Sequence, residues 1–328
     1  MKKLLLTSAI VAVAFSSSSF AEVKISGEIE QTWTSHSYEP TGSKVNGSNA
    51  IGSEANVKFT GEKELTNGAK VNAAIRAENQ GSIFRVDQKE LGITIGGFKA
   101  HVGIDTGSTI DGNMVVHVGQ QSEDVMAGPT ALLAKATHSK FSAHDKEHIG
   151  FSFKNDMGEL ALNYAPSNNT SNGPSSITDA GASATEIVFT GSLGVKGLAI
   201  KVGQQDTGSD NGSGSDEKEK FYGATYSIGK AKVGYSNRSF DREGTAVEID
   251  NSNSYSVAYA VSDNLSVAVE RLDTKEKGTA NEEELTLIGV SYNLGGLGIE
   301  AYYGQAKDIG GASGADSDAV QLRTVFAY

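Results

Sequence analysis

Alternation of apolar and polar residues with a period of two runs along most of this chain and constrains its fold more than any other feature. Leu198, Ile200 and Val202, for example, alternate with polar positions such as Lys201. Short runs of this kind are typical of β-strands that have one apolar and one polar face. Helical periodicity is nearly absent, so the chain is expected to be all-β. Alternation does not tell which face lies inside, because a soluble β-sandwich and a membrane barrel both alternate.

The connections between the strands alternate between short turns and longer polar segments. Gly, Asn and Asp in the turns supply the positive φ that tight hairpins need. The seven short turns lie at about 66–68, 96–97, 156–158, 193–195, 229–230, 263–264 and 294–296. The eight longer connections lie at about 38–52, 79–83, 106–146, 166–184, 206–219, 240–251, 273–281 and 306–317. Fifteen connections imply sixteen strands with both termini on the short-turn side, an asymmetry that outer-membrane barrels show.

Charged residues within the strands require water on one face. Lys58, Arg76, Glu270 and Arg323 occupy polar positions between apolar neighbours. All four prolines lie in predicted connections, and Tyr and Phe gather near strand ends, as in the aromatic girdles of membrane barrels. Only helices or closed barrels can pair every backbone amide in lipid. We therefore predict a sixteen-stranded antiparallel transmembrane β-barrel with short periplasmic turns, long external loops and an aqueous lumen.

The N-terminus has the three parts of a secretory signal peptide. Lys2 and Lys3 make the start basic, residues 4–15 are apolar, and residues 19–21 read Ser-Phe-Ala, which fits the small-x-Ala cleavage pattern. The apolar run is well short of the roughly 20 residues that a spanning helix needs. We expect residues 1–21 to be removed on export and residues 22–328 to form the barrel. Loss of the two lysines changes the formal net charge from −12 to −14.

Composition and motifs exclude several classes of function. The absence of cysteine excludes a disulfide framework and thiolate chemistry, and the net charge of −12 argues against a general nucleic-acid binder. His144, Glu147 and His148 have the H-x-x-E-H spacing of some zinc peptidases. That chemistry needs a helix to place both imidazoles on one face, but a strand is predicted to begin at Ile149. Segments 206–216 and 310–318 superficially resemble calcium loops, and we expect solvated external loops there. We expect no catalysis, no cofactor and no metal.

Metal binding near the longest connection stays open as an alternative, because five of the six histidines lie between His101 and His148.

Several stretches resemble the sixteen-stranded, trimeric general porins of Gram-negative bacteria. Residues 57–71 run from an aromatic-glycine strand through an Asn-Gly turn into a second alternating strand, and this is similar to the family's second hairpin. Residues 90–93, followed by Gly97 and Phe98, resemble the next hairpin, and residues 23–34 resemble the opening strand. The last strand ends on Tyr328 with Phe326 before it. It resembles the terminal strand that the barrel-assembly machinery reads.

The resemblance implies a homotrimer in which loop 3, here about 106–146, folds into the lumen and constricts the pore. Its acidic residues Asp111, Glu123 and Asp124 are then candidates for the constriction. The candidate pore-wall residues are Glu28, Asn56, Lys58, Lys70, Arg76 and Arg323. Many relatives carry wall arginines where this chain has Glu28, Asn56 and Ile104. Fewer wall arginines and the negative charge predict a lumen that prefers cations.

The sequence therefore predicts a passive outer-membrane channel for small hydrophilic solutes and ions. Its expected partners are outer-membrane lipid, lipopolysaccharide and the barrel-assembly machinery, with no nucleic acid. Two alternatives stay open: a substrate-selective channel, which would need ligand-specific residues such as an aromatic slide, and a secreted β-sandwich or adhesin domain.

Overall fold

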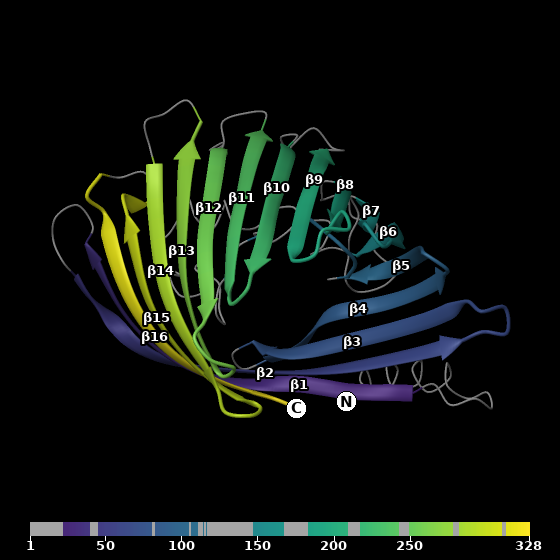
Figure 1. Ribbon diagram of the computed structural model, residues 1–328, viewed down its shortest axis with the longest axis horizontal. Coiled ribbons are helices and arrows are strands. Elements are labelled where there is room, and N and C mark those ends of the chain that lie inside the picture. The colour runs from purple at the N-terminus through teal and green to yellow at the C-terminus, as the bar shows by residue number, and fades with distance from the viewer. Residues whose placement is uncertain are drawn as a thin grey trace.

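The described part of the chain folds into one closed, antiparallel β-barrel (Figure 1). The computed structural model describes residues 22–39, 45–80, 83–104, 106–110, 114, 116, 147–166, 183–208, 217–242, 249–277, 282–309 and 313–328. Each strand pairs with its neighbours in sequence, and β16 returns to pair with β1. Within these residues, no helix is both long and apolar enough to cross a membrane.

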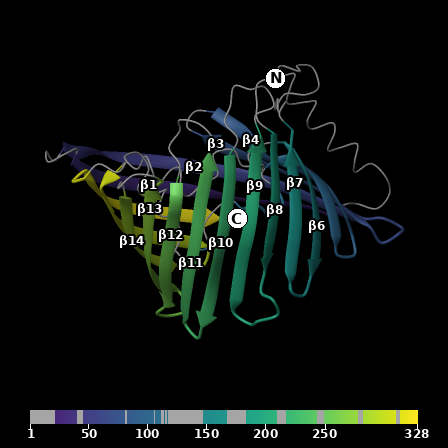
Figure 2. The same ribbon diagram turned by 90° about the horizontal axis from the view of Figure 1, so that it is seen from above.

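The sixteen strands are β1 (Glu22–Glu39), β2 (Val45–Glu64), β3 (Lys70–Gln80), β4 (Ile83–Ile95), β5 (Phe98–Ile104), β6 (His148–Asn155), β7 (Gly158–Ala165), β8 (Ser183–Gly191), β9 (Leu198–Gly208), β10 (Glu217–Ile228), β11 (Ala231–Arg242), β12 (Ile249–Ala260), β13 (Leu265–Glu276), β14 (Glu282–Asn293), β15 (Leu297–Lys307) and β16 (Asp316–Ala327). The predicted strand number is confirmed, and the predicted alternation of turns with longer connections holds from β5 onward but not for the connections between β1 and β5. Figure 2 shows the turns that join β6 to β7, β8 to β9 and β10 to β11 at the same end of the barrel.

The two faces of the barrel have the reverse polarity of a soluble protein. In β6, the outward side chains of Ile149, Phe151 and Phe153 are 45%, 56% and 41% exposed, whereas the intervening Ser152 is buried. The same arrangement recurs around the barrel, with most large apolar side chains outside and most polar or charged side chains inside, although Leu272, Leu285 and Leu287 form a buried apolar cluster. An exposed apolar band of this extent is stable only against lipid. The β-sandwich alternative is therefore wrong.

Aromatic side chains mark one edge of the apolar band. The rings of Tyr222, Tyr235 and Tyr255 lie on adjacent strands with centroids 6.2 Å and 5.3 Å apart. The polar residues Lys220 and Asn237 lie on the same outer face as Tyr222 and Tyr235. Each lies two residues nearer to a longer connection than the tyrosine of its strand. An amphipathic ring is favoured at the lipid–water boundary, so the strands continue beyond this boundary into water.

Strands extend farther into the longer connections than alternation predicts. The connection expected at 38–52 is reduced to 40–44, because Tyr38 pairs with Val45 across a ladder that has an irregularity between Ser35 and Ser37. Likewise, only residues 81 and 82 separate β3 from β4. Strand segments outside the membrane have water on both faces, so their sequence does not alternate and the strand end cannot be read from it.

The polarity of the two faces predicts how arginine substitutions will behave. Ile187 lies at the middle of β8 and is 49% exposed, so Ile187→Arg places a charge against lipid and is expected to cost about 2–4 kcal/mol. Thr190→Arg is the matched control. Its side chain faces the lumen opposite Glu159, so we expect a change within about 0.5 kcal/mol. Unfolding free energies measured in lipid vesicles test this, and equal effects at the two positions would contradict the assignment of the faces.

Candidate pore wall and loop 3 anchor

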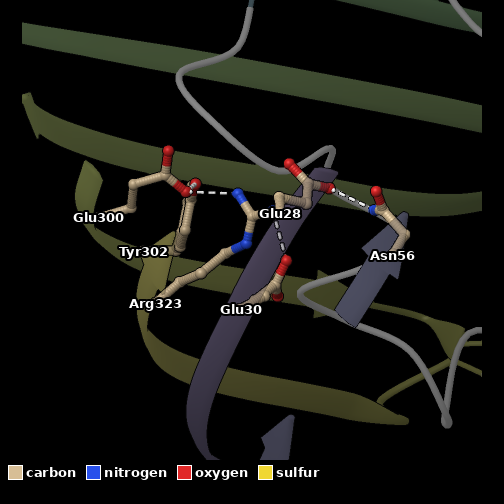
Figure 3. Close-up of polar contacts among 6 residues, drawn as sticks. All are labelled: Glu28, Glu30, Asn56, Glu300, Tyr302 and Arg323. Atoms are coloured by element: carbon tan, nitrogen blue, oxygen red, sulfur yellow. Dashed lines mark hydrogen bonds and ion pairs between the residues drawn. The ribbon is translucent and has the colours of Figure 1, made fainter. Parts of the chain in front are cut away.

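An ion network closes the seam between the first and last strands on the luminal face (Figure 3). Arg323 of β16 lies between Glu300 of β15 and Glu30 of β1. Its Nη1 donates to Glu300 Oε2 at 2.8 Å, and its Nη2 donates to Glu30. The hydroxyl of Tyr302 donates to the same Glu300 oxygen at 2.5 Å. One guanidinium thus joins three strands that meet at the point of barrel closure, and the cluster keeps a net negative charge.

The other predicted wall residues lie on the same face of β1 to β3. Asn56 is paired with Glu28 in the ladder and donates to its Oε1 at 3.0 Å. Lys58 is paired with Arg76, whose Nη2 lies 2.5 Å from Asp87 Oδ2.

Lys70 is separate from these residues. It lies at the short-turn end of β3, where its Nζ is 2.8 Å from Glu62 in an exposed ion pair. The resemblance places position 104 on the pore wall, but Ile104 faces outward. Its neighbour Gly103 faces the lumen beside His148, and adjacent residues of a strand face opposite sides.

The described residues of loop 3 lie against the inner wall. Ile110 is fully buried and packs with Ala161 of β7, Val188 of β8 and Phe221 of β10, and Met114 packs against the same cluster. The Val116 amide donates to Ser256 Oγ of β12 at 2.6 Å. These described residues of loop 3 thus lie along the luminal face between β7 and β12. The predicted constriction residues Asp111, Glu123 and Asp124 lie outside the described residues.

Glycines in the wall make room for this path. A Cβ on Gly203 would collide with Ile110 Cγ2, and a Cβ on Gly223 would lie 2.5 Å from Met114 Cβ. A side chain at either position would push the loop away from the wall.

Arg238 of β11 anchors loop 3. It is fully buried, forms an ion pair with Glu219 of β10 and donates from Nη2 to the Ile110 carbonyl at 2.8 Å. Its guanidinium also lies 4.9 Å from the centroid of the Phe221 ring. Asn163 makes a second anchor, because its Nδ2 donates to the Ser108 carbonyl at 2.9 Å.

The buried charges of the inner wall are mostly negative. Among the described residues, seven glutamates but only one arginine are buried. The glutamates are Glu30, Glu186, Glu217, Glu219, Glu270, Glu283 and Glu300, and the arginine is Arg238. Within the same residues, no group of three or more acidic or histidine side chains is arranged to hold a metal ion.

Sequence reasoning assigned no role in the site to the anchor residues Arg238, Glu219 and Asn163 or to the seam partners Glu30 and Glu300, although it placed Glu300 on a polar strand face. All five occupy polar positions within alternating strands, so a search for inward-facing positions could have found them as a class. Their pairing could not have been found, because it depends on the register between strands.

The C-terminal residues lie on the outer surface at the short-turn end. Phe326 and Tyr328 are both about half exposed. The backbone of Tyr328 exchanges hydrogen bonds with Gly27 of β1, at 3.0 and 3.1 Å. The last residue therefore closes the ladder with the first strand, while its ring and that of Phe326 remain accessible.

A closed barrel with an apolar exterior and a charged interior defines the protein as a transmembrane β-barrel of the pore-forming kind. Its family follows from the sequence: the profile of the Gram-negative porins matches residues 7–328, and the chain belongs to that family. A comparison with curated protein sequences gives no match. The protein is thus an outer-membrane porin of the Gram-negative type, as the resemblance implies.

Solved porin structures share the fold at low sequence identity. The anion-selective porin from Comamonas acidovorans has a TM-score of 0.68 and 14% identity over 94% of this chain and 100% of that one. The trimer form of OmpT, an outer membrane protein of Vibrio cholerae, has a TM-score of 0.65 and 14% identity over 94% and 99%. A mutant of the Rh. blastica porin has a TM-score of 0.62 and 15% identity over 94% and 100%.

Proposed function

We propose that this porin is a passive, cation-preferring channel for small hydrophilic solutes and ions, constricted by loop 3 at about 106–146. The proposed constriction is supported by the position of Ile110, Met114 and Val116 along the inner wall. In this proposal the rest of loop 3 projects into the lumen, and Asp111, Glu123 and Asp124 line the narrowest part.

The excess of buried luminal carboxylates supports the cation preference. Fixed negative charges inside a low-dielectric wall attract cations and repel anions. Ion pairing reduces this excess without removing it, since Arg323 is shared by two glutamates. The structurally similar Comamonas porin is anion-selective, so this proposal implies that the barrel alone does not set the sign of selectivity.

The proposal extends to assembly and export. We infer a homotrimer, as in the trimer form of the Vibrio cholerae OmpT, and removal of residues 1–21 as a signal peptide. Phe326 and Tyr328 would be read by the barrel-assembly machinery, and the outer surface would contact outer-membrane lipid and lipopolysaccharide. Transport requires filtering by size and charge only, so we infer no catalysis.

Reversal potentials in a planar bilayer under a salt gradient test the cation preference. Glu28 is half-buried on the wall, and for an ion passing at about 6 Å through water its charge contributes about 0.7 kcal/mol. Glu28→Gln is therefore expected to lower the cation-to-anion permeability ratio by up to about threefold. The control Asp156→Asn lies in the turn between β6 and β7 and should leave the ratio unchanged. A wild-type channel that prefers anions would contradict the proposal.

A further inference from the structure

Two histidines meet on the luminal face at the root of loop 3. His101 of β5 and His148 of β6 lie 47 residues apart in sequence, and their Nε2 atoms are 3.4 Å apart. Both side chains are buried, at 3% and 1% exposure, and the rings are nearly perpendicular. A separation of 3.4 Å is longer than a normal N–H hydrogen bond. The two imidazoles therefore make at most a long, weak hydrogen bond to each other.

Oxygen atoms from two other elements face the same place. Thr106 Oγ1, in loop 3, lies 3.3 Å from His148 Nε2. Asn163 of β7 is fully buried, and its Nδ2 donates to the Ser108 carbonyl and, at 3.0 Å, to Glu186 Oε1. These two bonds fix the amide orientation, so the Oδ1 atom is the acceptor that remains. Among the described residues this Oδ1 has no hydrogen-bond partner, which is costly for a buried carbonyl.

Glycines keep the space around the two rings open. Gly150 stands opposite His101 in the ladder, and a Cβ there would collide with the His101 ring and lie 2.7 Å from Asn163 Oδ1. A Cβ on Gly107, which has φ +78°, would lie 2.8 Å from His101 Nε2. The acceptor Oδ1 and the Nε2 edge of His101 therefore border one space, which any side chain at these two positions would fill.

We propose that His101 and His148, completed by oxygen from Thr106 and Asn163, bind a divalent transition-metal ion of the type of Zn²⁺. In a tetrahedral zinc site with Zn–N bonds of 2.0–2.1 Å, two imidazole nitrogens are about 3.3–3.4 Å apart. The observed Nε2 separation of 3.4 Å matches this distance. Imidazole nitrogen favours Zn²⁺, Cu²⁺ and Ni²⁺ over Mg²⁺ or Ca²⁺.

The ligand set differs from the one that the H-x-x-E-H spacing suggests. Glu147 forms an ion pair with Lys89 outside this cluster, whereas His148 of that motif lies within it. Its partner His101 comes from the neighbouring strand. An ion held here would tie β5, β6 and β7 to the first residues of loop 3.

Isothermal titration of the purified full-length porin in detergent with Zn²⁺ tests the site. His101→Ala and His148→Ala are each expected to weaken binding at least about tenfold, because losing even an outer-shell partner costs about 10–100-fold in metal affinity. His36→Ala, on β1, and His144→Ala, in the H-x-x-E-H motif, are matched controls that should retain wild-type affinity. Mg²⁺ should not compete.

Co²⁺ serves as a second probe, because a tetrahedral site gives an absorption signature that solvated Co²⁺ lacks. Heat-modifiable gel mobility shows whether each variant barrel is folded, so a lost signal can be assigned to the site. No Zn²⁺ binding by the wild type, or affinity lost in His144→Ala and retained in His101→Ala, would overturn the proposal. This outcome is independent of ion selectivity and of channel activity.

Discussion

Replacing Arg238 with methionine is expected to loosen loop 3 and to destabilise the barrel by about 3–5 kcal/mol, which is typical when one partner of a buried ion pair is removed. The substitution takes away the counter-charge that Arg238 gives to buried Glu219 and the hydrogen bond to the Ile110 carbonyl. Since Ile110 lies at the start of the luminal path of loop 3, the single-channel conductance should change and its open state should become noisier. Bilayer recording and denaturant unfolding measure the two effects.

A double variant separates the two roles of Arg238. Arg238→Met with Glu219→Gln removes both charges, so most of the lost stability should return. The hydrogen bond to loop 3 is still absent, so the altered conductance should persist. Wild-type conductance in both variants would show that Arg238 does not position the loop.

Replacing Arg323 with glutamine is expected to have the second large effect. Arg323 is the shared partner of Glu30 and Glu300 at the seam where β16 meets β1, and all three side chains are largely buried. Its loss leaves two carboxylates facing each other across the seam, and we expect a cost of about 3–5 kcal/mol. The lumen also gains negative charge, so the reversal potential should shift further towards cation preference.

Arg323→Lys is the matched control. It keeps the positive charge but lacks the planar fork that binds two carboxylates at once. We therefore expect nearly wild-type selectivity with an intermediate loss of stability. If the lysine and glutamine variants were equally stable, the two-sided hydrogen bonding would not matter. If their selectivities were equal, the charge of residue 323 would not act on passing ions.

The strand count and the orientation of most strand side chains followed from the sequence. Ile149, Phe151 and Phe153 alternate with smaller or polar residues, and the structure turns these three side chains outward. Glycines of the predicted turns adopt positive φ, at +79° for Gly68 and +59° for Gly229. These features are local, because a strand face has a period of two and a tight turn requires a left-handed residue. A single sequence therefore suffices to predict them.

The candidate site was predicted only in part. Glu28, Asn56 and Arg323 were assigned to the wall as single residues, and the structure places the Glu28–Asn56 pair beside the Arg323 network (Figure 3). The partners of Arg323 were not predicted, since Glu30 lies 293 residues from it in sequence. The extended ends of β1 and β2 were also missed, because strands with water on both faces lose their alternation.

The sequence by itself determined the strands and their turns, because alternation and turn residues are properties of neighbouring positions, and it predicted a barrel with lipid outside and water inside. Only the tertiary structure decided which luminal groups meet. Arg238 reaches a carbonyl of loop 3 that is 128 residues away, and His101 reaches His148 across a ladder whose register brings them together. Alternation with a period of two shows which face a side chain occupies, but it does not show which residue lies opposite. Register and closure therefore had to come from the fold.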